Sequence, residues 1–391
     1  MQNMQAESNS TRHNDWVNIV FFSITTFFGL IIAPWYVFKN GLSLVEIWLT
    51  VFYLIATGMS ITVGYHRLFA HATYKAHPIV RFLLLFFGAA AFEQCVLDWA
   101  SQHRDHHRYV DQDMDPYSIK RGFWYAHIGW LLFYSHKLHY ENAQDLQKDP
   151  MVMHQAKYYV LWAAVSGIIL PVVIGGLFGY AWGAFLVAVC FRITFVYHAT
   201  FCINSVCHMF GKPTYDVYST AKDHWFVAFL TYGEGYHNFH HRFPSDYRNA
   251  VRWYQWDPSK WMIKAMSWLG LVWDLKTVSK FRIMEARIMG ENQLASDALA
   301  SLKQSPTLNK AMETLKLQQH NLRVALSNWE IAIKEYQTSF QQKSHDLAQN
   351  ARVKVEETKE NFYEARRNWL LLTRLAPDQL EKFLLSATAR N

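Results

Sequence analysis

The stretch H-R-D-H-H at residues 103–107 decides how the rest of this sequence is interpreted. Its three histidines are spaced i, i+3 and i+4, so an α-helix would carry their imidazoles on one face. The same spacing recurs in H-N-F-H-H at 237–241, and a looser cluster, H-R-L-F-A-H, occupies 66–71. The histidines of the looser cluster are five residues apart and need a helix end or a bend to share a face. Neutral imidazole is the commonest protein metal ligand, and eight histidines exceed the first shell of one ion, so the sequence predicts a two-metal site.

The composition indicates a membrane protein. Hydrophobic residues make up 51% of the chain and charged residues 18%, with much of the apolar content in the first 210 residues. The net charge of +7 is modest, and no basic patch with interleaved aromatics suggests nucleic-acid binding. The four cysteines lie in or beside apolar stretches and form no C-x-x-C pair, which predicts reduced packing residues and neither disulfides nor zinc ligands.

Four apolar segments are long enough to cross a bilayer core of roughly 30 Å. They pair into two hairpins joined by short turns, and they cover residues 17–37, 44–63, 158–178 and 182–206. Two further apolar segments, 79–92 and 123–134, are interrupted by charge or too short, and we expect them to be buried or interfacial. The sequence therefore predicts an all-α membrane protein with four transmembrane helices.

The basic residues fix the expected topology. Nine Lys and Arg residues lie between positions 66 and 156, whereas the two short turns on the opposite side contain only Lys39. Positive residues mark the cytoplasmic side, so all histidine clusters and both termini should be cytoplasmic. Inside the fourth segment, Asn204 and His208 are at i and i+4. We interpret His208 as a ninth ligand and Asn204 as a partner that either hydrogen-bonds to a ligand or reaches the metal through water.

After about residue 290 the sequence changes character. Apolar residues recur at helical spacing among charges, as in an amphipathic or coiled-coil helix. These residues are Leu315, Leu322, Leu326, Trp329, Ile333, Tyr336, Phe340 and Leu347. We divide the chain into a transmembrane domain with a cytosolic cap (1–289) and a helical extension (290–391). A last short helix is expected at 377–387, and the extension is interpreted as a surface for a partner or for homo-oligomer formation.

Four other residues are candidates for substrate contacts. Trp99 precedes His103 by four residues, so it would line the same helical face, or it is an ordinary interfacial tryptophan. Arg104, Lys120 and Arg121 could hold the phosphates of a headgroup, although positive-inside charge explains the last two equally well. The acidic run at 111–115 lacks the glycine and the final glutamate of a calcium loop, so calcium binding is rejected.

The ligand type alone leaves zinc, copper, iron and nickel open, because all of them accept imidazole nitrogen. A structural zinc needs only four ligands in a closed site. Nine ligands shared between two ions leave an open position on each ion, which suits chemistry with dioxygen and favours iron.

The three histidine clusters, in this order and at these intervals, resemble those of the membrane-bound acyl-CoA desaturases of the stearoyl-CoA type. The resemblance extends to D-W-A before the second cluster, D-P-Y-S-I-K-R-G-F-W-Y-A-H-I-G-W-L-L after it, N-S-V-C-H at 204–208, and G-E-G-Y before the third cluster. It covers roughly residues 15 to 285, and the combination is far more specific than any single cluster.

This resemblance implies a mushroom-like fold of four spans with a cytosolic cap that holds a di-iron centre. The residues that match the ligands of the family are His66, His71, His103, His106, His107, His208, His237, His240 and His241, with Asn204 acting through water. The implied reaction is the removal of two hydrogens from a saturated acyl-CoA, with O2 as co-substrate, to give a cis double bond at carbon 9. The electrons come from a separate protein.

Several points stay open at this stage. The sequence has no G-x-G-x-x-G fingerprint, so we expect an external donor: ferredoxin, rubredoxin or a b-type cytochrome with an NAD(P)H reductase. His198 stands where animal relatives often have asparagine. The helical tail and the lack of a retention signal favour a bacterial inner membrane. The alternatives are an acyl-lipid desaturase or a membrane di-iron hydroxylase, whereas a metal transporter is disfavoured because the clusters gather on one side.

Overall fold

The computed structural model describes residues 13–134, 138–300, 306–341 and 345–373. Its contacts divide the chain into two compact units: one formed by 1–213 and 219–277, the other by 214–218 and 278–391. The domain boundary expected between residues 289 and 290 falls inside helix α16 (Lys280–Ala300) and stays a prediction. The predicted short helix at 377–387 lies outside the described residues.

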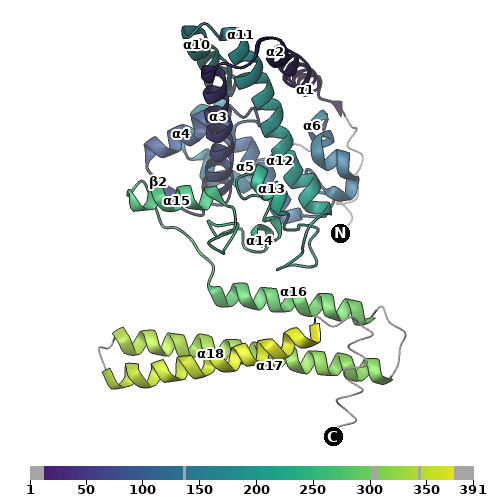
Figure 1. Ribbon diagram of the computed structural model, residues 1–391, viewed down its shortest axis with the longest axis vertical. Coiled ribbons are helices and arrows are strands. Elements are labelled where there is room, and N and C mark those ends of the chain that lie inside the picture. The colour runs from purple at the N-terminus through teal and green to yellow at the C-terminus, as the bar shows by residue number, and fades with distance from the viewer. Residues whose placement is uncertain (1–12, 135–137, 301–305, 342–344, 374–391) are drawn as a thin grey trace. The chain divides into compact units, whose positions relative to one another are not determined.

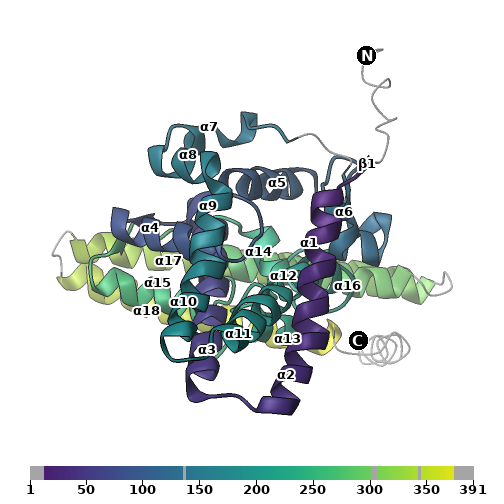
Figure 2. The ribbon, with the colours of Figure 1, turned by 90° about the horizontal axis from the view of Figure 1, so that it is seen from above.

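Among the described residues of the first unit, four continuous helices are long and apolar enough to cross a membrane. They span Trp16–Asn40, Leu44–Ala70, Tyr159–Leu177 and Ala181–Met209, which confirms the four segments expected from the sequence. The fourth span contacts the other three, and in Figure 2 its helix α12 (Arg192–Met209) lies among them.

Every span contains a π-helical segment between or after its α-helices. The first three spans are built from α1 (Trp16–Phe27), η1 (Phe28–Ile32) and α2 (Ala33–Asn40); α3 (Leu44–Met59) and η2 (Ser60–Ala70); and α9 (Tyr159–Ala164), η6 (Val165–Ile169) and α10 (Leu170–Leu177). The fourth consists of α11 (Ala181–Ala184), η7 (Phe185–Phe191) and α12. Such π-helical segments often occur at functional sites.

A tight turn and a capping box join the first two spans. Gly41 has a φ of 73°, a value that favours glycine, and Ser43 begins α3. Ser43 Oγ accepts a hydrogen bond from the Glu46 backbone N–H at 3.2 Å, and Glu46 Oε2 accepts one from the Ser43 N–H at 2.7 Å. Tyr36 Oη also donates to Glu46, so this buried carboxyl is satisfied close to the outer end of the span.

The cap is built from shorter helices, of which α4 (Pro78–Ala89) and α5 (Val96–Tyr109) are the longest before the third span. The others are η3 (Ile119–Arg121), η4 (Tyr125–Gly129), α6 (Trp130–Leu132), η5 (Glu141–Ala143), α7 (Gln144–Gln147), α8 (Pro150–Lys157), α13 (Trp225–Leu230), α14 (His237–Arg242) and α15 (Pro258–Trp268). Two short antiparallel pairings join β1 (His13–Asn14) to β3 (Phe133–Tyr134) and β2 (Lys75–Ala76) to β4 (Val272–Trp273). Figure 1 shows α4, α5, α14 and α15 near one end of the long helices.

Arg192, in the fourth span, has a structural role. Its side chain is fully buried, and its guanidinium donates to the carbonyls of Ala188 at 3.0 Å, Gly167 at 2.6 Å and Ala90. The charge also lies 5.5 Å from the centre of the Tyr53 ring. One buried cation thereby ties the third and fourth spans to the turn between α4 and α5.

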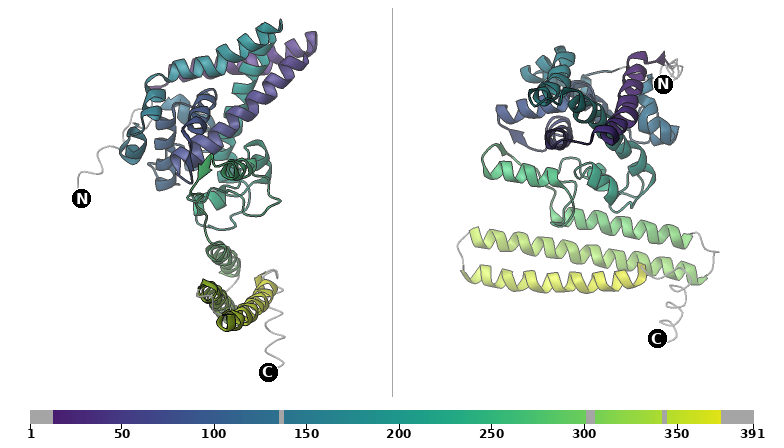
Figure 3. Two further views of the ribbon diagram at one scale, coloured as in Figure 1. Left: turned by 90° about the vertical axis from the view of Figure 1, so that its left-hand side faces the viewer. Right: turned by 45° about the horizontal axis from the view of Figure 1, so that its top comes forward.

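Among the residues that the structure describes in the second unit, three helices pack together: α16, α17 (Pro306–Gln341) and α18 (His345–Thr373). Figure 3 shows them running side by side. Four residues of the predicted apolar stripe are buried in its core, namely Leu315, Leu322, Leu326 and Trp329. The end of the stripe is not buried: the side chains of Phe340 and Leu347 are 69% and 54% exposed. The predicted role of these helices in binding a partner stays a prediction.

Candidate metal centre

A π-helix brings His66 and His71, which are five residues apart, to the same side of the chain. Segment η2 carries His66, and His71 follows directly after its end. The His71 backbone N–H donates to the His66 carbonyl at 3.0 Å, which is the i to i+5 bond of a π-turn. The two rings therefore lie on the same side, with centres 4.9 Å apart.

Three other helices supply the remaining imidazoles. Helix α5 carries the 103–107 cluster and α14 the 237–241 cluster, as the i, i+3, i+4 spacing predicts, and α12 delivers His208 near its end. The nine side chains sort into two groups whose nitrogens all lie within 4.8 Å of one another. One group is His66, His71, His103, His107 and His240; the other is His106, His208, His237 and His241.

Distances within the groups fit metal ions. Six Nε2–Nε2 distances lie between 2.8 and 3.2 Å, three within each group. Examples are His71–His103 at 2.8 Å and His208–His237 at 3.0 Å. Adjacent ligands of an octahedral ion at about 2.1 Å from each nitrogen would be about 3.0 Å apart. The nitrogens thus converge as ligands do, and the two groups fit two separate ions.

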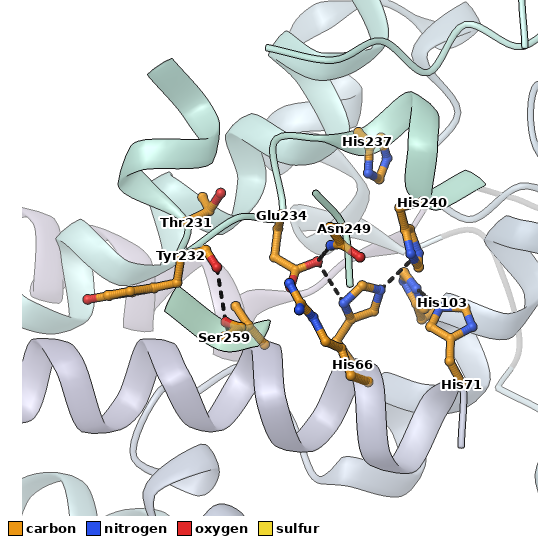
Figure 4. Close-up of polar contacts among 12 residues, drawn as sticks. His66, His71, His103, Thr231, Tyr232, Glu234, His237, His240, Asn249 and Ser259 are labelled. Atoms are coloured by element: carbon orange, nitrogen blue, oxygen red, sulfur yellow. Dashed lines mark hydrogen bonds and ion pairs between the residues drawn. The ribbon is translucent and has the colours of Figure 1, made fainter. Parts of the chain in front are cut away.

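A buried carboxylate supports the five-histidine group (Figure 4). Glu234 Oε2 lies 2.7 Å from His66 Nδ1 and accepts a hydrogen bond from Asn249 Nδ2 at 2.6 Å. Its other oxygen accepts from Arg67, which also pairs with the buried Asp257 at 3.0 Å. A carboxylate behind a ligating histidine fixes the ring's tautomer and orientation and raises its basicity.

The four-histidine group has supports of its own. Asp115 Oδ1 lies 2.9 Å from His106 Nδ1, and both residues are buried. Thr220 Oγ1 donates to Asp111 at 2.6 Å, so it can accept from His208 Nδ1, also at 2.6 Å. The acidic run rejected as a calcium loop therefore contributes two carboxylates that hold histidines in place.

Burial favours the neutral, metal-binding form of most of the imidazoles that lie outside the spans. It is the largest cause lowering the pKa of six of them, and the neighbouring imidazoles add to the effect. The six are His71, His103, His107, His237, His240 and His241. A low pKa means that these ligands need no deprotonation at neutral pH before an ion binds.

A cavity adjoins both groups. Its lining includes His66 and His103 from one group, His237 from the other, and the predicted residues Trp99 and Asn204. The Trp99 ring stacks on His103 with centres 4.9 Å apart, so this tryptophan borders the cavity as expected from its spacing. The lining also contains many apolar residues, among them Phe22, Ile61, Phe92, Leu131, Phe201 and Ile203.

Glu93 also lines this cavity, and no sequence pattern pointed to it. Trp99 Nε1 and Thr200 Oγ1 donate to its two oxygens at 3.3 and 2.8 Å. Burial raises the pKa of this carboxyl from its ordinary value of 4.5 to about 7, against the opposing effect of these two hydrogen bonds. A carboxyl that changes charge near neutral pH therefore borders the space beside the metal centre.

The three residues predicted to contact phosphate differ in their surroundings. Arg104 uses all its donors on the protein: it pairs with Asp145 at 2.6 Å and donates to the carbonyls of Phe69, Ala70 and Asn142. This arrangement favours a structural role. Lys120 and Arg121 are exposed beside each other, and Arg121 contacts the Tyr125 hydroxyl. Substrate contacts at all three residues stay predictions.

His198, inside α12, forms a polar pair with His127 of η4. His198 Nδ1 lies 3.0 Å from His127 Nε2, and His127 Nδ1 lies 2.9 Å from Ser205 Oγ. Burial, followed by the neighbouring His198, lowers the pKa of His127 to about 4. The pair joins η4 to the fourth span.

The structure thus combines four candidate membrane spans with two groups of histidines, each of which could hold a metal ion. The family model for fatty acid desaturase matches residues 46–267, which is more than half of the chain and includes all three clusters. The chain belongs to the fatty acid desaturase family, and its resemblance to the stearoyl-CoA type is confirmed.

Three relatives show the range within this family. The "Probable acyl-CoA desaturase" of Schizosaccharomyces pombe is 40% identical over 68% of this chain and 57% of its own length. The "Acyl-CoA Delta-12 desaturase" of Tribolium castaneum is 37% identical, over 69% of this chain and 77% of the relative. The "sn-1 stearoyl-lipid 9-desaturase" of Anabaena variabilis is 33% identical, over 68% of this chain and 95% of the relative's own length. The chain spans less than two thirds of the length of the yeast relatives that it matches.

These relatives bear on the predicted location. The four candidate spans agree with an integral membrane protein. The relatives come mostly from yeasts and animals, so a bacterial inner membrane is not supported. The presence of a long tail and the lack of a retention signal were too indirect to assign a source.

Proposed function

We propose that this protein is an oxygen-dependent acyl-CoA desaturase that forms a cis double bond, with carbon 9 as the expected position. The observation that carries the proposal is the pairing of two convergent histidine groups with one apolar cavity that touches both. Relatives described as acyl-CoA desaturases support the reaction and the substrate class. The Tribolium relative is described as a delta-12 desaturase, so relatives within this family differ in the position of the double bond.

In this proposal the nine histidines would hold two iron ions, one at the five-histidine group and one at the four-histidine group, and Asn204 would act through water. Iron supplies the oxidation by O2 that an unactivated C–H bond requires, since no side-chain base approaches its acidity. Carboxylates Glu234 and Asp115 orient the ligands. The apolar lining excludes water and fixes which carbon of the acyl chain lies beside the histidines.

The electrons come from an external protein, either ferredoxin, rubredoxin or a b-type cytochrome with an NAD(P)H reductase. We place the histidine groups and both termini on the cytoplasmic side, because the positive residues concentrate there. Lys120 and Arg121 are the proposed contacts for the phosphates of the coenzyme. Both are exposed in η3, which contacts α12, and α12 supplies part of the cavity lining.

A second candidate is an acyl-lipid desaturase, which the description of the Anabaena relative favours. Both reactions use the same metal centre and differ in the headgroup that the cap must bind. Fatty-acid analysis in cells without their own desaturase tests the first step: a new cis-monounsaturated acid supports desaturation, and hydroxylated chains would contradict it. Purified protein with a matched donor then separates the carriers, because only an acyl-CoA desaturase converts stearoyl-CoA in the absence of glycerolipid.

A further inference from the structure

An aromatic surface gathers on the segment that follows the fourth span. It consists of α13, α15 and the loop before α15, and its exposed members are Trp225, Phe226, Phe229, Trp253, Tyr254, Trp256, Trp261, Trp268 and Leu269. Trp225 is 74% exposed and Trp268 is 76% exposed. We call this set the aromatic surface. A contiguous apolar surface of this kind usually marks an interaction site.

Both helices turn an apolar face outward. In α15, Trp261, Ala265 and Trp268 are exposed at i, i+4 and i+7, whereas Ile263 and Met266 are buried in the core. In α13, Trp225, Phe226 and Phe229 are exposed, and the Phe229 ring lies 5.4 Å from Trp256. Ring contacts continue from Trp256 to Trp261 at 5.7 Å, so the two helices form one surface.

The contacts of this segment with the second span give its depth in the membrane. The Tyr232 ring packs on Gly58, where a Cβ would overlap it, and Ser259 Oγ lies 2.6 Å from Thr62 Oγ1. Gly58 and Thr62 follow Leu44, the outer end of the span, by 14 and 18 residues, or about 21 and 27 Å at 1.5 Å per residue. The hydrocarbon core is about 30 Å thick, so the end of α13 and the start of α15 lie near its inner boundary.

Orientation and charge agree with this depth. Figure 1 shows α15 running across the lower end of α3, as a helix lying along a membrane surface would. All three acidic residues between positions 225 and 269 are buried, namely Glu234, Asp246 and Asp257. The basic residues Arg252 and Lys264 are exposed, and Lys264 Nζ lies 6.0 Å from the centre of the Trp268 ring. Tryptophan and tyrosine with flanking lysine and arginine are the residues of the lipid headgroup region.

We propose that the aromatic surface inserts into the headgroup region of the cytoplasmic leaflet, as a membrane contact in addition to the four spans. The partner is a phospholipid surface, favoured when it carries anionic headgroups. Helix α14, with its three histidines, lies between α13 and α15 in the chain. The contact therefore anchors both ends of the segment that supplies the third histidine cluster.

Spin labels on the full chain in lipid nanodiscs test this proposal. Cysteine is introduced by Phe229→Cys or Trp268→Cys; Phe52→Cys in the second span and Met114→Cys in the cap are references. Phe229, Phe52 and Met114 are matched in exposure, at 55%, 52% and 54%. Collisions with O2, which concentrates in the bilayer, are compared with collisions with a water-soluble nickel chelate. The unsubstituted chain gives the background from the native cysteines, and size-exclusion chromatography confirms folding.

We expect labels at 229 and 268 to favour O2 over nickel several-fold, as at Phe52, and the label at 114 to favour nickel. Anionic lipid should strengthen the preference at 268, and Lys264→Gln should remove that increase. Labels at 229 and 268 that behave like the label at 114 would show a surface in water and overturn the proposal. Protection from both reagents would assign the surface to a protein, either a second copy or a partner, and would overturn it equally.

Discussion

Replacing Glu234 by glutamine tests whether the carboxylate behind His66 controls metal binding. Its Oε1 faces Arg67 and its Oε2 faces His66 Nδ1 and Asn249 Nδ2, so each side meets hydrogen-bond donors. The amide nitrogen of glutamine would oppose a donor in either orientation. Loss of such a carboxylate typically weakens metal binding about 10–100-fold, or about 1.4–2.7 kcal/mol. Arg67 keeps its pair with Asp257, so we expect only about 2–3 kcal/mol of lost stability.

The assay is the iron content of the purified full-length protein after equilibration with increasing chelator, together with its melting temperature. Asp246→Asn is the matched control. Asp246 is also buried, and it pairs at 2.7 Å with Arg248, which is not one of the histidine ligands. We expect both variants to lose stability and only Glu234→Gln to release iron at lower chelator concentration. If its iron curve overlaid that of the unchanged protein, Glu234 would be a purely structural residue.

Three further predictions use the same preparation. His106→Ala should lower bound iron and abolish product, whereas the exposed His320→Ala should change neither; full activity in His106→Ala would refute its ligand role. Because folding raises the pKa of Glu93 to about 7, stability tied to its neutral form is present below pH 4.5 and is lost as the pH rises through 7. Melting curves at pH 5 and 8 should show this loss, at most about 3 kcal/mol, and Glu93→Gln should lack it. Arg192→Met should destabilise the chain by about 1–3 kcal/mol, seen as a lower melting temperature, because the carbonyls of Ala90 and Gly167 lose their donor.

The spans and the order of the histidine clusters could be predicted because both depend on local patterns. Uncharged runs of the required length predict a membrane helix wherever they occur. The i, i+3, i+4 spacing predicts one face of a helix, and α5 and α14 confirm it. The spacing of five between His66 and His71 predicted only some departure from a straight helix. That this departure is an 11-residue π-helix depends on packing against α4 and α5, which no local pattern encodes.

The exposed end of the apolar stripe in the second unit has a related cause. Helical spacing predicts which residues share a face but gives no information on how far the partner helix extends along it. Leu322 and Trp329 are buried, and the Trp329 ring contacts Phe362 of α18. Phe340 lies one residue before the end of α17 and is exposed.

The groups behind the histidines could not be predicted, because they come from distant parts of the chain. Glu234 reaches His66 across 168 positions of sequence, and its own charge is balanced by Arg67, the residue next to that histidine. Asp115, in contrast, accepts from the backbone N–H groups of Asp111 and Tyr117, and these two donors are neutral. The two carboxylates therefore differ in how strongly they attract the imidazole proton. That difference would make His106 the more electron-rich ligand, so the two metal sites need not be equivalent even though both are built from imidazole alone.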